Sequence, residues 1–149
     1  MVAMSAVPSS TIIADVITKL KTLLTTNLTT GTVYTSYPEK NVDYPIVTIA
    51  HSGFRDEYGS IGTEYKIVYV NVRIEVWSMS TKERDEIWDD IYDELRTHYK
   101  TADGSGDSVT NISLFDMLVM SCLDIDIPRE RGHLHKKVSE IQFSFYATS

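Results

Sequence analysis

Two histidines near the carboxyl end are the best candidates for metal chemistry in this chain. In His133-Leu-His135 both imidazoles would project from one side of a strand, and His51 or Asp124 would serve as a third ligand. Nothing in this spacing specifies a closed site, and the neighbouring lysines and arginine disfavour a bound cation. Solvent-exposed histidines at the start of a strand are the simpler interpretation, so we predict no metal site.

Three aspartates form a second candidate cluster, suited to magnesium binding or acid–base catalysis. Asp124 and Asp126 share one face of a strand, and Asp116 precedes them in the chain. A solvent-facing stripe opposite the apolar positions of Leu123–Ile127 explains the pair without chemistry. We favour that interpretation.

A nucleophilic or nucleotide-dependent enzyme finds little support in the remaining residues. Cys122 lies beside methionine and leucine rather than a base, which predicts a small buried hydrophobic residue. The sequence contains no phosphate-binding Gly-Lys-Ser/Thr loop, no Gly-x-Ser-x-Gly elbow, no dinucleotide fingerprint and no zinc-protease motif. These observations predict a protein without catalytic residues or cofactors.

Length and composition set further bounds. The chain of 149 residues, 42% hydrophobic and 23% charged, has the size and composition of one globular domain. A net charge of −7 disfavours a protein whose task is to bind nucleic-acid phosphates. The single cysteine excludes an internal disulfide and indicates a reducing compartment. We expect no signal peptide and no membrane span, since no apolar run approaches about 20 residues.

One strand, Thr63–Ser80, must position the other elements. Its residues alternate almost without interruption, with valine and isoleucine on one face and aromatic, Asn, Arg and Glu side chains on the other. The aliphatic face requires a covering layer, for which helices are the expected source. The mixed face suits either a protein contact or a solvated surface.

Two amphipathic segments supply that layer. The first begins near Ser9 or Ser10 and fades through Thr25–Thr30, where β-branched residues and a glycine follow. The second begins at the sequence Ser80-Thr-Lys-Glu83, which fits a capping box, and runs to about Tyr99 or Lys100.

The remaining segments predict short strands and three irregular stretches. Strands are expected at Thr32–Tyr34, 46–50, 118–127 and 136–146. Residues 1–8 are expected to be a loose N-terminal arm, 51–62 a long functional loop between strands, and 101–107 a flexible connector. Residues 108–117 are ambiguous, with one helical turn near Ser113–Met117 as an option. This order of elements predicts a single α+β domain with two main helices packed on a mainly antiparallel sheet of four or five strands.

Five features follow one another in this sequence: an amphipathic first helix, Tyr44-Pro-Ile-Val-Thr-Ile49, a long strand ending Ile74-Glu-Val-Trp77-Ser, a helix opening Ser80-Thr-Lys-Glu83, and a closing strand His135-Lys-Lys-Val-Ser-Glu140-Ile-Gln-Phe143. Over roughly residues 10–147, this order of parts resembles the tail terminator and tail-to-head joining proteins of long-tailed bacteriophages. It is a resemblance of pattern, because that family has no invariant catalytic motif.

The resemblance implies a non-enzymatic virion protein, assembled in the host cytoplasm, that forms a homo-hexameric ring in the tail or neck. Its implied partners are the tail tube protein and the head connector or stopper protein, while DNA passes through the lumen without specific binding. A ring subunit needs two different outward patches. The aromatic and charged side chains expected to form them are Phe54, Arg55, Asp56, Glu57, Tyr58, Tyr65, Tyr69, Arg73, Trp77, Arg129 and Arg131.

Three alternatives stay open from the sequence. One is another neck component, such as a head-completion or stopper protein. The second is a small metal-dependent enzyme that uses His133, His135 and the aspartates. The third is a monomeric adaptor that binds a protein partner.

Overall fold

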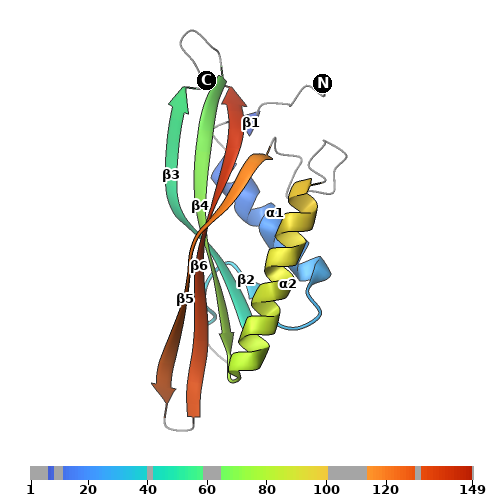
Figure 1. Cartoon of the computed structure of the whole chain (residues 1–149), viewed down its shortest axis with the longest axis vertical. Helices are drawn as coiled ribbons and strands as arrows, with labels where there is room; N and C mark the ends of the chain where they lie inside the picture. The colour runs from blue at the N-terminus through green and yellow to red at the C-terminus, as the bar shows by residue number, and fades with distance from the viewer. Residues whose placement is uncertain are drawn as a thin grey trace.

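The computed structural model describes residues 7–8, 12–39, 42–58, 65–100, 114–129 and 132–148. Figure 1 shows an elongated, strongly twisted sheet with two helices on one side. In chain order the elements are β1 (Val7–Pro8), α1 (Ile12–Asn27), β2 (Thr32–Tyr34), β3 (Ile46–Tyr58), β4 (Tyr65–Ser78), α2 (Thr81–Lys100), β5 (Leu114–Arg129) and β6 (Gly132–Thr148).

Four long strands form the sheet in the order β3, β4, β6 and β5, and each is antiparallel to the next. The two short strands lie parallel to a long one, β2 beside the first residues of β3 and β1 beside the last residues of β6. The predicted α+β fold, with two helices on a mainly antiparallel sheet, is confirmed; β1 adds a sixth, two-residue strand.

The core lies between the helices and one face of the sheet. The predicted aliphatic face of β4 is buried as a continuous row, and the apolar stripes of α1 and α2 pack on it together with Ile141 and Phe143 of β6. The row consists of Val68, Val70, Val72, Ile74 and Val76. Period-2 alternation therefore located the buried face of β4 correctly, because consecutive strand residues point to opposite faces.

The loop predicted at 51–62 is wrong over its first eight positions. Strand β3 continues to Tyr58, paired with β4, and a bulge between His51 and Gly53 absorbs one extra residue. Gly53 packs closely on Asn71, since a Cβ there would lie 3.1 Å from the amide nitrogen of Asn71. The prediction failed because this stretch has a polar sequence without an apolar pattern. It is a strand because its backbone is hydrogen-bonded to the long neighbouring strand β4. Residues 59–62 lie outside the described part.

Other boundaries also differ from the predictions. Val7 and Pro8 of the expected loose arm pair with β6, and Leu114 begins β5 where a helical turn was an option. The last two strands are longer at both ends than predicted, because each supplies the other's hydrogen bonds. The connector predicted at 101–107 lies outside the described residues.

At the start of α2, one of the two hydrogen bonds of the predicted capping box is formed. The Ser80 hydroxyl accepts a hydrogen bond from the Glu83 amide at 3.3 Å, as expected for an N-cap. The Glu83 carboxylate instead accepts a 2.7 Å bond from the buried Ser78 hydroxyl, and Ser78 Oγ in turn accepts from the Ser80 amide at 3.1 Å. A serine on β4 thus joins the strand end to the helix start.

Gly132 begins β6 with a φ of 84° and no atom within 4 Å of the position that a Cβ would take. We expect Gly132→Ala to lower the free energy of unfolding by about 1 kcal/mol, through backbone strain and without a steric clash. Gly132→Asn should cost less, because asparagine tolerates a positive φ. Urea denaturation of the two variants measures the difference; equal values for alanine and asparagine would contradict the backbone explanation.

Candidate interaction surface

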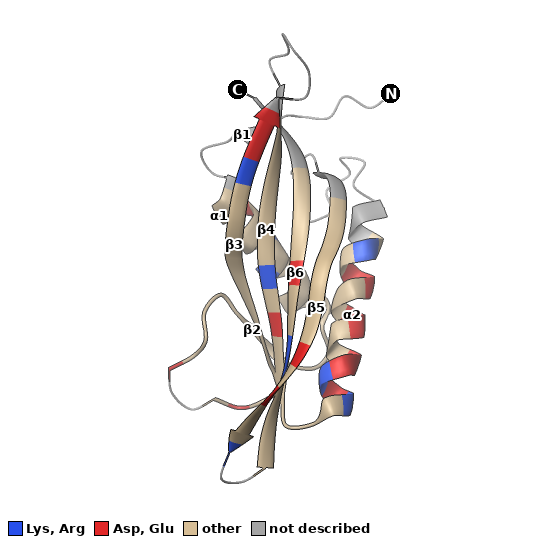
Figure 2. Cartoon of the chain, turned by 60° about the vertical axis from the view of Figure 1, so that its left-hand side comes forward, with Lys and Arg blue, Asp and Glu red and all other residues tan. Residues whose placement is uncertain are grey.

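The sheet face turned away from the helices carries most of the contact residues predicted from the sequence. We call it the outer face; on β4 it consists of the odd-numbered residues from Ile67 to Trp77. Figure 2 shows the strands from this side, with α2 at the edge of the view. Because paired residues of adjacent strands share a face, the register places Arg55 and Glu57 of β3 and Glu140 of β6 on the outer face as well.

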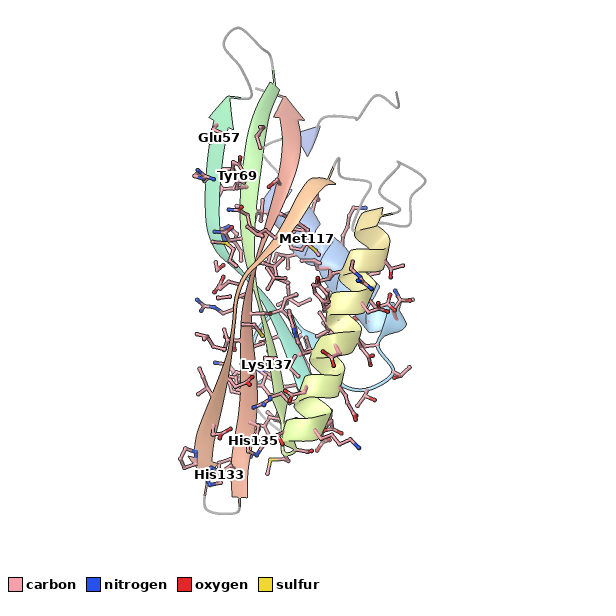
Figure 3. The ribbon with its side chains drawn as sticks, in the orientation of Figure 1. Glu57, Tyr69, Met117, His133, His135 and Lys137 are labelled. Atoms are coloured by element: carbon pink, nitrogen blue, oxygen red, sulfur yellow. The ribbon has the colours of Figure 1, made fainter. Side chains whose placement is uncertain are left out.

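Near one end of the outer face, Tyr69 is held by two side chains of β3. Its hydroxyl donates a 2.6 Å hydrogen bond to Glu57, and the Arg55 guanidinium lies 4.2 Å from its ring centroid. Arg55 also approaches Glu57 at 3.7 Å. Figure 3 shows Glu57 and Tyr69 side by side on neighbouring strands. The structure thus brings together three residues that the sequence predicts in a loop and in a strand.

The middle of the outer face carries a charged group from three strands. The Arg73 Nε donates to Glu140 at 2.6 Å, and the Ser52 hydroxyl donates to the second oxygen of that carboxylate, also at 2.6 Å. The hydrogen bond to Glu140 raises the pKa of Arg73, which keeps the guanidinium charged. Glu140 was missed as a partner because its register against β4 depends on the tertiary fold.

At the other end of β4, Trp77 lies among aromatic and cationic groups. The Tyr37 ring meets it edge-on at 4.9 Å between centroids, and the Lys136 ammonium lies 4.3 Å from its centroid. The Tyr37 hydroxyl forms a short hydrogen bond with the Tyr44 hydroxyl, and burial with this bond raises the pKa of Tyr37 to about 12. The Arg129 guanidinium lies 5.7 Å from the Tyr44 ring centroid. Trp77 and Arg129 therefore belong to one cluster.

The other predicted contact residues lie elsewhere or beyond the described part. Phe54 is paired with Val70 and Asp56 with Val68, which places both on the helix side of the sheet, where Phe54 is 45% exposed. Tyr58 and Tyr65 lie in β3 and β4, but their side chains are not described, and Arg131 is outside the described residues.

Strand β5 carries an exposed apolar stripe that sequence reasoning missed. Leu118, Leu123 and Ile125 are 56%, 61% and 44% exposed. The alternation of Leu123–Ile127 was recognised, but its faces were assigned the wrong way round. The aspartates face the helix side, because cations there attract them, and the leucine and isoleucine face outward. The sequence feature that could have indicated this orientation is the arginine in the first turn of α2.

That arginine, Arg84, is 5% exposed and sits among carboxylates of α2 and β5. Its nitrogens lie 3.0 Å from Asp85, 3.4 Å from Asp124 and 3.9 Å from Asp126. Lys137 completes the group at 2.8 Å from Asp124 and 3.2 Å from Asp85. We call these five residues the Arg84 network; it joins α2 to the β5–β6 hairpin.

Two carboxyls of the Arg84 network have lowered pKa values. For Asp126 the main cause is a 2.7 Å hydrogen bond with the His135 Nδ1. For Asp85, partial burial raises the pKa, but hydrogen bonds from Arg84 and Lys137 outweigh it and lower the value. Both carboxyls are therefore held ionised.

Neither the histidine pair nor the cysteine lies in an arrangement suited to catalysis. His133 and His135 stack at 6.3 Å between ring centroids, as Figure 3 shows near the tip of the hairpin. Within the described part of the chain, no three His, Cys, Asp or Glu side chains gather closely enough to hold a metal ion. Cys122 is exposed, contrary to the prediction of a buried residue, and partial desolvation raises the pKa of its thiol. A raised pKa reduces the reactive thiolate.

These elements define a small α+β protein with two helices on one face of a twisted sheet and a broad polar–aromatic outer face. No described helix is long and apolar enough to cross a membrane. No family model matches the sequence, and no curated protein does. Among solved structures, the chain is similar to a protein chain in the virion of a native gene transfer agent particle. The TM-score is 0.58 at 12% identity, and the match covers 96% of this chain and 100% of the other. At this identity the similarity establishes a shared fold.

Proposed function

We propose that this protein is a structural component of a phage-like virion, and specifically a tail terminator that forms a hexameric ring between tail tube and head connector. The observation that carries the proposal is the fold shared, over nearly the whole of both chains, with a component of a gene transfer agent virion. The sequence resemblance to tail terminators supplies the more specific role.

The surface of the molecule supports an assembly role over a catalytic one. Aromatic and arginine side chains contact one another on the outer face, as in the Arg55–Tyr69 and Tyr37–Trp77 pairs. Tyrosine, tryptophan and arginine are the residue types enriched at protein interfaces. The chain's charge of −7 suits a ring whose lumen lets DNA pass without binding to it.

Imaging of particles purified from cells that produce this protein tests the proposal. We expect the protein in the particle fraction at six copies per particle, by quantitative mass spectrometry, and density for its fold at the junction of tail tube and neck. A different copy number at another neck position would favour a stopper or head-completion protein. Absence from purified particles would contradict a virion role of any kind.

A further inference from the structure

The sheet ends in two long strand edges. Strand β5 pairs with β6 along one edge, and none of the described strands pairs with its other edge. Strand β3 pairs with β4, and on its other edge β2 covers positions 46–48 alone, which leaves 49–58 as outer edge. Exposed edges of this length present rows of backbone donors and acceptors and favour pairing with another strand.

The directions of these two edges fit each other. The strands β3, β4, β6 and β5 alternate in direction, so β5 runs opposite to β3. A second copy related by rotation about an axis along the strands keeps its β3 in the original direction. That β3 would therefore meet β5 of the first copy as an antiparallel neighbour, with the helices of both copies on the same side of the sheet. Repetition of this contact gives a head-to-tail assembly, and a ring if the rotation closes.

The side chains on the helix side of the two edges also fit. A groove of about 490 Å³ opens between α2 and β5, lined by Trp88, Tyr92, Met117, Leu118, Val119 and Cys122. Figure 3 shows Met117 on the part of β5 that lies next to α2. On the other edge, Phe54 of β3 is on the helix side and 45% exposed. A phenylalanine at a sheet edge and an apolar groove beside the opposite edge are a complementary pair.

We infer that copies of this protein join edge to edge: residues 49–58 of β3 in one copy pair antiparallel with β5 of the next, and Phe54 enters the groove between α2 and β5. The inference rests on the proposed ring assembly and names the surfaces that build it. The occupant is a second copy because one chain carries both edges, with matching direction and matching apolar groups. The sheets of successive copies then form one continuous sheet around the assembly.

The single cysteine of the chain provides a direct test. Cys122 is exposed on β5, and its pairing with Ser139 places it on the helix side. With Phe54 beside Val119, the antiparallel alignment brings His51 of the neighbouring copy opposite Cys122. His51 is exposed and shares the helix side with Val72. We expect His51→Cys, oxidised with diamide or treated with a short bismaleimide, to form a ladder of covalent oligomers on a denaturing gel, since each copy links to two neighbours.

Lys82→Cys is the matched control, because its side chain is 85% exposed and belongs to α2 rather than to either edge strand. It should yield at least tenfold less of the ladder than His51→Cys. Phe54→Asp added to His51→Cys should suppress the ladder, while circular dichroism shows the fold retained. Equal ladders from His51→Cys and Lys82→Cys would overturn the inference. So would efficient Cys122–Cys122 dimers in the unaltered protein, because β5 would then face β5.

The same reaction inside purified particles separates this inference from the proposed function. Protein that is present in particles at several copies but gives no His51→Cys ladder there would show that the edge pairing is wrong while the virion role stands. Protein that is absent from particles but forms the ladder in solution would remove the virion role and support the edge pairing.

Discussion

Val72→Asp is expected to leave the protein unfolded at room temperature. Val72 is fully buried at the centre of β4, paired with His51 on one side and Ile141 on the other, beneath the helices. An ionised carboxylate in such a site costs several kcal/mol even after relaxation. A domain of this size is stable by only about 5–15 kcal/mol in total. Loss of the cooperative thermal transition by calorimetry, and of near-ultraviolet circular dichroism, would show the effect.

Arg73→Ser, at the next position, is the matched control on the outer face. It removes the ion pair with Glu140, but the Arg73 side chain is 49% exposed, so we expect a loss of no more than about 1 kcal/mol. The two neighbours should therefore differ by several kcal/mol. A stable, cooperative Val72→Asp variant would show that the two faces of β4 are assigned wrongly.

Arg84→Met is expected to lower the free energy of unfolding by about 2 kcal/mol at neutral pH. The guanidinium is 5% exposed, and its removal leaves the carboxylates of Asp85 and Asp124 close together with Lys137 as their remaining cation. Breaking a fully buried ion pair costs about 3–5 kcal/mol, and partial exposure of these carboxylates reduces that figure. Urea denaturation measures the loss. Arg96→Met is the control, because Arg96 is 53% exposed and pairs with Asp93 along the same helix, so a change within about 0.5 kcal/mol is expected.

The cost of Arg84→Met should shrink in acid. The folded-state pKa values of Asp85 and Asp126 lie below the ordinary carboxyl value of 3.8. Carboxyls with lowered pKa values contribute stability that is complete above this value and is lost as the pH falls below it. Protonated carboxyls no longer need the arginine, so the stability difference between the two proteins should begin to shrink below about pH 4 and disappear below the lowered folded-state pKa values. A difference that stays constant down to pH 2.5 would contradict an electrostatic role for Arg84.

The sequence by itself determined the parts of the fold that local patterns encode. The alternation of Thr63–Ser80 identified β4 and its buried face, and the three-and-four spacing identified α1 and α2, because burial of one face selects residue type at a fixed period. The class of fold followed from the order of these elements. Among the candidate contact residues, Tyr69, Arg73 and Trp77 lie on the predicted face of β4, because alternation alone fixes their side of the strand.

Only the tertiary structure decided which long-range partners complete the surface. Residues 51–58 look like a polar loop, yet they form a strand because β4 offers an edge of matching length. The sides of Asp124 and Leu123 were reversed because the choice depends on Arg84, which is distant in sequence and adjacent in space. Glu140 reaches Arg73 through strand register. Register and helix docking depend on contacts between separated segments, and these contacts leave no periodic signal in any one of them.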